Sequence, residues 1–315
     1  MLFLFALPCL PVVSRQAQVG ALLHAQEGQL QDLQVVTKTI EDNYDYRPGM
    51  EVAVEGEKAE IFVETWDRNE ISVRLKLVAK HPVIDTARKE IENLTFITKR
   101  EGDKIYLRNK LVDQSLRPES ELYVYYYLTL PEDCPVYLKS HFGAANINNL
   151  KNRLRIFGEY TQININNVEG MMDINTRFGD ILGERLDGNV FITARRSDVE
   201  LYDIGGNFTI NSQYGELTVS PNSKLTDLQI NADRSDVYLI DPDGRPLSYS
   251  LSSTYGEMVL PDEVPVTELE SNDGIQRVRI ESGREIHGEI KVSVSFGSLI
   301  LEKQERALRN GRRRF

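Results

Sequence analysis

A short corner motif recurs along the C-terminal half of the chain and constrains the fold more than any other feature. Each copy contains an aromatic residue or Arg, then Gly or Ser, then an acid, then alternating apolar residues. The central residues of five copies are separated by 18, 18, 20 and 21 positions: Gly179, Ser197, Gly215, Ser235 and Gly256. Partial copies precede these at 141–143 (HFG) and 156–159 (IFGE), and a further copy, centred on Gly297, follows Gly256 after 41 positions, which fits two repeats with one degenerate turn. Such periods are typical of solenoids, in which each unit covers the apolar stripe and backbone edge of the previous one.

A second short strand is predicted between consecutive motifs. These segments alternate apolar and polar residues and lie at 172–176, 189–194, 207–212, 228–233 and 247–253. Two strands per repeat predict two facing sheets. Residues 137–302 are therefore predicted to form an all-β, single-stranded β-solenoid, similar to a β-helix, with about 18–21 residues per rung.

The preceding residues, 51–136, predict a small β-rich domain with one short helix. Alternation over 52–81, on both sides of a turn-like segment at 67–69, predicts a β-hairpin. Residues 85–94 change to a helical period, with Asp85 as the expected N-cap. Further strands are predicted at 104–108 and 121–130.

The first residues predict export. An apolar run at 2–13 has the length of a signal peptide, is too short to span a bilayer, and is followed by small residues at Ala17 and Ala25. We expect a signal peptide at 1–25, a linker at 26–50, no transmembrane span, and a periplasmic, outer-membrane-associated or secreted protein. No basic residue precedes the apolar run, so a buried N-terminal strand is the alternative.

The net charge excludes one class of partner. With 48 acidic against 37 basic residues, the formal charge of −11 repels nucleic-acid phosphates, so no nucleic-acid binding is expected. The basic tail at 303–315 reverses this charge locally. It is interpreted as a solvated tail, with contact to anionic lipid or glycan as the sharper hypothesis.

Cysteine usage points to a structural role. Without the leader, which contains Cys9, the remaining Cys134 has no partner for an intrachain disulfide and no neighbouring zinc ligand set. We interpret it as a small core residue.

The acids of the corner motifs are the first candidate binding residues. In aligned rungs they form a ladder with like charges about 5 Å apart: Asp180, Asp198, Glu216, Asp236 and Glu257. Either Arg177, Arg196 and Arg234 with local turn hydrogen bonds, or a bridging Ca²⁺, could offset the repulsion. The arginines and turn bonds are favoured, so no cofactor and no metal site is predicted. The turn at 241–244 hints at calcium but lacks further ligands.

Aromatic residues are the second candidate group. Trp66 and the strand face formed by Tyr123, Tyr125 and Tyr127 could stack on sugar rings. Cross-strand packing is the more common role of aromatic residues at strand spacing.

No catalytic motif is found. The chain has no HExxH, P-loop or dinucleotide-binding pattern, and its four histidines are scattered. No catalytic residue is predicted, and a non-enzymatic binding or structural module of the cell envelope is the first hypothesis. Two alternatives stay open: a glycan-processing β-helix that uses Asp180, Asp198 and Asp236 with arginines, and an assembly protein that polymerises through its ends.

One family resemblance rests on these same residues. The segment 59–81, followed by the FGD, RSD and YGE motifs, resembles the "putative adhesin" family of exported β-strand-repeat proteins of unknown function, of the Bacteroidetes type. The likeness covers about residues 50–300. It implies an extracytoplasmic β-solenoid, for which the adhesin label rests on shape and location, and it gives fold and compartment but no mechanism. An envelope glycan or protein as partner belongs to the first hypothesis above. The resemblance implies no catalytic residues.

Overall fold

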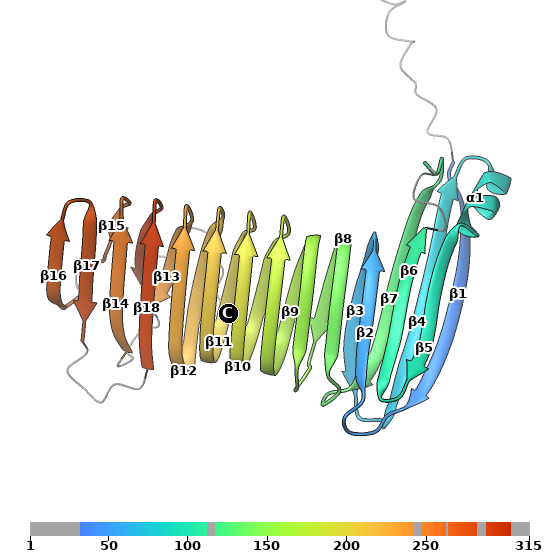
Figure 1. Ribbon diagram of the computed structural model, residues 1–315, viewed down its shortest axis with the longest axis horizontal. Coiled ribbons are helices and arrows are strands. Elements are labelled where there is room, and N and C mark those ends of the chain that lie inside the picture. The colour runs from blue at the N-terminus through green and yellow to red at the C-terminus, as the bar shows by residue number, and fades with distance from the viewer. Residues whose placement is uncertain (1–31, 112–116, 242–246, 263, 282–287, 304–315) are drawn as a thin grey trace, which may run out of the picture.

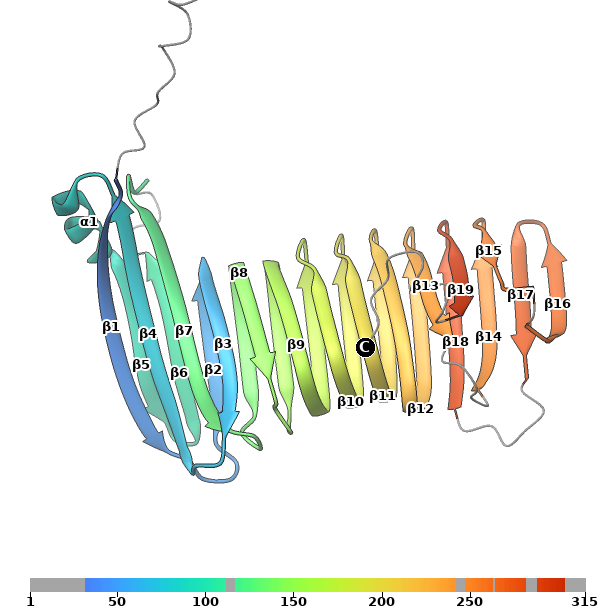
Figure 2. The same cartoon turned by 180° about the vertical axis from the view of Figure 1, so that it is seen from behind.

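The structure, a computed structural model, describes residues 32–111, 117–241, 247–262, 264–281 and 288–303. The fold class is all-β, as predicted, and the described residues contain a single helix. The strands form one elongated body. Its N-terminal strands and α1 (Ile84–Ile91) lie at one end, and β16 (Val266–Asn272) and β17 (Ile275–Ile280) lie at the other (Figure 1 and Figure 2).

The middle of the body is a stack of parallel strands that bend at corners and so contribute to two facing sheets. Its pairing register joins residues 18 positions apart, such as Ile163 with Ile181 and Ile181 with Val199. The strands of this stack are β8 (Val136–Asn148), β9 (Leu154–Arg177), β10 (Ile181–Arg195), β11 (Val199–Gln213) and β12 (Glu216–Asp233). Between β11 and β12 a bulge lengthens the register from 18 to 20, because Val199 pairs with Leu217 but Asn207 pairs with Asp227.

Inward-pointing residues explain why this register is kept. Successive residues of a strand point to opposite faces, so one residue of slippage would expose the apolar set. Ile163, Val199 and Leu217 share one row of the core and are each fully buried. Each such side chain contributes about 1.5–3 kcal/mol of burial free energy.

The N-terminal strands belong to the same pair of sheets. β2 (Glu51–Glu57) and β3 (Ala59–Trp66) bend at Lys58 and form the first turn of the stack, because both pair in parallel with β8. Further strands extend the two sheets from there: β1 (Gln34–Asp45), β4 (Glu70–His81), β5 (Leu94–Glu101), β6 (Lys104–Leu111) and β7 (Glu121–Pro131). The segment expected as a linker thus contains β1, which pairs with β4.

The predicted hairpin within 52–81 is wrong. Strand β7 lies between β3 and β4, parallel to β3 and antiparallel to β4. The turn at 67–69 only redirects the chain. Its residues form a turn whether or not a third strand separates the two arms, so the local pattern could not show the insertion.

The helix prediction holds for its place but not for its cap. α1 begins at Ile84, and its N-cap is Val83, without a side-chain hydrogen bond to the helix. Asp85 lies in the first turn and pairs with Arg88 at 3.3 Å, so its carboxylate favours the helix through the dipole. Among the described residues, no helix is long and apolar enough to cross a membrane.

The C-terminal rungs do not stack in chain order. The chain forms β13 (Asp236–Asp241), β14 (Leu247–Thr254) and β15 (Met258–Val259), turns through the β16–β17 hairpin, and returns as β18 (Gly288–Ser295) and β19 (Leu299–Lys303). β18 lies between β12 and β14, and β19 lies between β13 and β15. The 41-residue spacing before Gly297 was expected to hold two rungs stacked in order. The segment instead contains the end of one rung, the β16–β17 hairpin, and strand β18, which inserts between β12 and β14.

A pair of cysteine variants tests this order. Gln229 and Lys291 are directly paired on exposed positions of β12 and β18, so the double variant Gln229→Cys/Lys291→Cys should form an intrachain disulfide under mild oxidation. Ser250 lies one strand further away, about 10 Å from Gln229, so Gln229→Cys/Ser250→Cys should stay reduced. Mass spectrometry after thiol alkylation shows whether each double variant contains a disulfide or two free thiols. A bond in the second pair and not in the first would contradict the order.

Glu90 of α1 provides a pH-dependent contribution to stability. Its carboxylate accepts hydrogen bonds from the backbone N–H groups of Glu119 at 3.0 Å and Ser120 at 2.7 Å. Burial raises its pKa, but the hydrogen bonds outweigh burial and hold the pKa below its ordinary value of 4.5. A lowered folded-state pKa stabilises the protein above pH 4.5, and this contribution is lost as the pH falls through the folded-state pKa.

We therefore expect the free-energy gap between the wild-type protein and Glu90→Gln to narrow on acidification. Urea unfolding of both proteins at pH 6 and at about pH 3 measures the gap. An equal gap at both pH values would show that the carboxylate charge of Glu90 does not stabilise the fold.

Candidate functional site

A column of residues with left-handed backbone runs along one corner of the stack. Each has a φ between 49° and 59°, a region that costs non-glycine residues free energy. The column consists of Lys58, Phe142, Tyr160, Phe178, Arg196, Tyr214, Arg234, Phe296 and Tyr255, in spatial order. The same strained conformation in every rung places these side chains one above another.

Ring and cation stacking offsets this cost. Phe142, Tyr160 and Phe178 stack with ring centroids 4.8 Å apart. Arg196 then lies between two rings, 5.4 Å from Phe178 and 5.8 Å from Tyr214. Arg234 continues the pattern from Tyr214 to Phe296, and Tyr255 closes the column against Phe296 at 5.5 Å. Arginine therefore substitutes for an aromatic ring at two corners.

Packing between neighbouring corners explains the alternation of Gly and Ser in the motif. A Cβ atom on Gly215 would collide with the carbonyl oxygen of Ser197 in the rung before it. Ser197 is buried instead, and its Oγ accepts the N–H of Gly179 at 3.2 Å and donates to the carbonyl of Arg195 at 3.1 Å. A hydroxyl corner thus sits between two glycine corners.

The aromatic run of the column ends at Phe142. The next corner residue, Lys58, is exposed and lines a separate small hollow with Leu94 and Val124. Among the residues that the structure describes, Tyr160 is the ring that stacks on Phe142, and the corner on the other side is occupied by Lys58. Phe142 is 50% exposed, so part of its apolar ring surface faces solvent.

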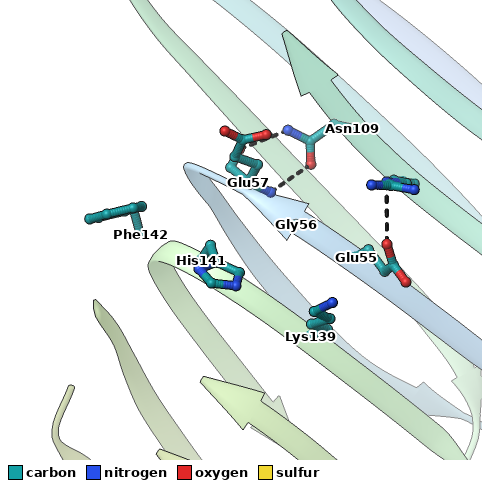
Figure 3. A pocket seen from close by; sticks show the side chains of 8 residues that line it. Glu55, Gly56, Glu57, Asn109, Lys139, His141 and Phe142 are labelled. Atoms are coloured by element: carbon teal, nitrogen blue, oxygen red, sulfur yellow. Dashed lines mark hydrogen bonds and ion pairs between the residues drawn. The ribbon is translucent and has the colours of Figure 1, made fainter. Parts of the chain in front are cut away.

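Phe142 borders a polar hollow of about 300 Å³ (Figure 3). The hollow forms where β6 diverges from β2, next to the corner of β8 at His141 and Phe142. Its lining residues are Glu55, Gly56, Glu57, Arg108, Asn109, Lys139, His141 and Phe142. In Figure 3, Phe142 and Glu55 lie at opposite ends of the hollow, and Glu57, His141 and Lys139 lie between them.

Asn109 holds the shape of this hollow. Its Oδ1 accepts the N–H of Glu57 at 3.2 Å, and its Nδ2 donates to the carbonyl of Glu57 at 2.8 Å, so the amide replaces a paired strand. Tyr126 also donates its hydroxyl to Oδ1 at 3.2 Å. Because Asn109 is buried, these bonds fix the end of β2.

The charged groups of the hollow differ in their partners. Arg108 pairs with Glu55 at 3.2 Å, and His141 Nδ1 lies 3.2 Å from Glu159. Lys139 has no ion-pair or hydrogen-bond partner among the described residues, although it neighbours Glu55 in the strand register. The hollow therefore presents carboxylates, an amide, an imidazole and a free ammonium beside a half-exposed aromatic ring.

The predicted ladder acids lie at exposed positions along one edge of the stack, in successive rungs from Asp180 to Asp236, but Ser298 stands between Asp236 and Glu257. The ladder carboxylates accept backbone N–H groups of the next rung: Asp180 from Asp198 at 2.9 Å, Asp198 from Glu216 at 2.8 Å, and Asp236 from Ser298 at 2.7 Å. Hydrogen bonds from backbone N–H groups at the turns thus occupy these carboxylates.

The arginines proposed as partners of the ladder make other contacts. Arg177 pairs with Glu159, Arg196 stacks between rings, and Arg234 contacts Asp233. Within the described ranges, no group of three or more His, Cys, Asp or Glu residues is placed to hold a metal ion. Binding by Glu216, Glu257 and the other ladder acids stays a prediction, as does Ca²⁺. Most of the turn at 241–244 lies outside the described residues.

The tyrosine face lies on the outer side of β7. Tyr123, Tyr125 and Tyr127 stack with centroids 6.4 Å apart, and Tyr127 also stacks on Phe62 at 5.2 Å. Cations cover part of this row, Arg74 over Tyr127 at 4.9 Å and Lys80 over Tyr123 at 4.6 Å. These contacts favour cross-strand packing, and sugar binding at these tyrosines stays a prediction.

Trp66 and Cys134 have structural partners. Trp66 donates its indole N–H to the carbonyl of Glu70 at 2.7 Å and carries Arg68 over its ring at 4.9 Å. Cys134 is fully buried, and burial raises the pKa of its thiol to about 12, which keeps it protonated. The predicted signal peptide at 1–25 and the basic residues of the tail at 304–315 lie outside the described residues.

Sequence analysis missed the hollow. Phe142 and His141 appear in the first corner motif, but their importance depends on Lys58 being the next corner in space, 84 positions earlier in the chain. Asn109 carries no sequence signal beyond its place near the end of a strand. The available clue was that the motif at 141–143 is the first of the series.

Comparisons with known proteins leave the chain unassigned. No protein-family model matches it, and a search of curated proteins finds no significant match. Solved structures match with low similarity. A "putative cell adhesion protein" from Clostridium sporogenes is 9% identical, with 85% of this chain and 100% of that chain covered and a TM-score of 0.28.

Two further structures come from related sources. A "putative adhesin" from Bacteroides fragilis is 7% identical over 84% of this chain and 97% of its own, with a TM-score of 0.36. A "putative lipid binding protein" from Parabacteroides distasonis is 9% identical over 84% and 96%, with a TM-score of 0.32. Likeness at this level carries no argument about function, and membership of the adhesin family stays a prediction.

Replacing Asn109 should destabilise the protein and open the hollow. In Asn109→Ala, both backbone groups of Glu57 and the hydroxyl of Tyr126 lose their partner, so the free energy of unfolding should fall by about 2–3 kcal/mol. Asn211→Ala, at an exposed asparagine pair on β11, is the control and should cost less than about 1 kcal/mol. Chemical denaturation measures both values. Equal losses would show that Asn109 has no special role.

Proposed function

We propose that the protein is a non-enzymatic, carbohydrate-binding module of the cell envelope, and that the hollow beside Phe142 is its sugar site. The carrying observation is the half-exposed ring of Phe142 at the rim of a hollow lined by amide, carboxylate and ammonium groups. A sugar ring combines an apolar face with hydroxyl edges, so it needs an aromatic surface and convergent polar groups together. The hollow supplies both.

The column defines where the sugar ring would lie. Phe178, Tyr160 and Phe142 stack at 4.8 Å, and the next corner residue, Lys58, contributes an exposed flexible side chain instead of a ring. A sugar stacked on the exposed ring surface of Phe142 would continue the column beside Lys58. Its hydroxyls would face Glu57, His141 and Lys139, which offer both acceptors and donors.

The hydrogen bonds of the ladder acids favour binding of a glycan without its cleavage. The carboxylates of the alternative enzyme hypothesis, Asp180, Asp198 and Asp236, each accept a backbone N–H from the next rung, so they act as structural acceptors. Export to the envelope rests on the predicted signal peptide and the family resemblance, and it is part of the same proposal.

A glycan array followed by titration calorimetry tests the sugar site. The wild-type protein should bind at least one glycan, and Phe142→Ala should weaken that binding about tenfold, or about 1.4 kcal/mol, because the stacking face is lost. Phe191→Ala is the matched control: Phe191 is a similarly exposed phenylalanine of β10, in neither the column nor the hollow, and its loss should leave binding unchanged.

Three results would contradict the proposal. They are the absence of binding to every glycan, equal affinity of the wild-type protein and Phe142→Ala, and release of new reducing ends from the bound glycan. Circular dichroism of each variant shows whether a loss of binding reflects a loss of fold.

A further inference from the structure

A second hollow lies on the same sheet face as the sugar site. Its volume is about 390 Å³. The lining residues are Glu51, Lys104, Pro135, Val136, Tyr137, Arg153, Arg155, Phe157 and Asp173. Like the first hollow, it combines aromatic rings with charged groups, and Phe157 is 52% exposed.

The two hollows follow one another along the same three strands. Glu51 and Glu55 are four positions apart on β2, Lys104 and Arg108 on β6, and Tyr137 and His141 on β8. Residues at even spacing point to the same face of a strand, and four positions correspond to about 13 Å. The hollows adjoin where Lys139 of the first is paired with Phe157 of the second, and their equivalent residues lie about 13 Å apart along β8. A ligand that fills both over this length must be longer than one monosaccharide.

Charge distinguishes these hollows from the rest of the molecule. The lining of both together contains the acids Glu51, Glu55, Glu57 and Asp173 and the bases Lys104, Arg108, Lys139, Arg153 and Arg155. Four negative against five positive groups give +1, in a chain with a formal charge of −11. The lining of the two hollows is thus slightly basic, although the chain as a whole is acidic.

One cation in each hollow is available to a ligand. Lys104 pairs with Glu51 at 2.9 Å, and Arg155 pairs with Asp173 at 3.4 Å. By contrast, the side chains of Arg153 and Lys139 have no ion-pair or hydrogen-bond partner among the described residues. A free ammonium, paired in the strand register with Phe157, and a free guanidinium in the lining of the second hollow are placed to bind anionic groups that repeat along a ligand.

We propose that the two hollows bind one linear acidic polysaccharide, which lies along β8 with sugar rings against Phe142 and Phe157 and anionic groups at Lys139 and Arg153. This inference rests on the proposed sugar site and specifies its ligand class. An acidic polymer is favoured over a neutral one because a neutral sugar would leave both cations without a counter-charge.

Galacturonate oligomers of one to eight units, and the same oligomers as methyl esters, are suitable probes because esterification removes the charge and keeps the sugar. Affinity for the acidic oligomers should rise with length until both hollows are filled. It should exceed that of the esters at least tenfold and should fall with added salt. Calorimetry at two salt concentrations measures these effects.

Variants separate the charge effect from the sugar site. Lys139→Gln and Arg153→Gln should each weaken binding of the long acidic oligomers about threefold to tenfold and leave the esters unchanged. Arg195→Gln, at an exposed arginine of β10 on the same sheet face but outside both hollows, should change neither. Because all three side chains are exposed, the variants should fold normally.

The outcomes distinguish the two proposals. Equal, Phe142-dependent binding of acids and esters would keep the sugar site and overturn the acidic ligand. Affinity that does not rise beyond a single sugar would overturn the spanning of both hollows. If neither probe binds while another glycan binds through Phe142, only the acidic-polymer inference fails. If no glycan binds at all, both proposals fail.

Discussion

The close approach of one rung's backbone to the next is the constraint on which the structure depends. Parallel pairing satisfies the backbone N–H and C=O groups of each rung only when another rung lies about 4.8 Å away. At the corners this distance leaves no room for a Cβ atom, which is why Gly215 faces the carbonyl of Ser197. It also brings the left-handed corner residues to ring-stacking distance, as for Phe142 and Tyr160 at 4.8 Å. Core rows, corner glycines and the outer column thus follow from one spacing.

The sequence predicted the features that recur in every rung. The 18-residue period, the paired strands within 137–302 and the place of the acid ladder were readable because each recurs in several copies. Long-range pairings were not readable. β7 between β3 and β4, and β18 between β12 and β14, are insertions that local patterns do not encode, since a strand's alternation fixes its faces but not its neighbours.

Aromatic residues show the same limit within the candidate site. Tyr123, Tyr125 and Tyr127 were singled out because they form a visible row, yet their rings contact one another and nearby cations. Phe142 was read only as one copy of a motif. What distinguishes it is its position beside Lys58, where the aromatic run stops. A repeat identifies what its members share, whereas the proposed sugar site depends on the member that has a stacked ring on one side and Lys58 on the other.

Both hollows lie where the regular stack meets the N-terminal strands. The second lies where β2 and β6 are paired at Glu51 and Lys104, whereas the place of the first follows from the end of that pairing. Where β9, β10 and β11 pair over their length, outward side chains form closely spaced rows such as the hydrogen-bonded Asn189 and Asn207. β6 pairs with β2 only up to Glu55, and beyond it the Asn109 side chain replaces the strand. The sheet face opens there without leaving backbone groups unpaired. A stack of this kind can form a recess at small cost only where its repeat is interrupted and the lost pairing is replaced, and the junction at β2 meets both conditions.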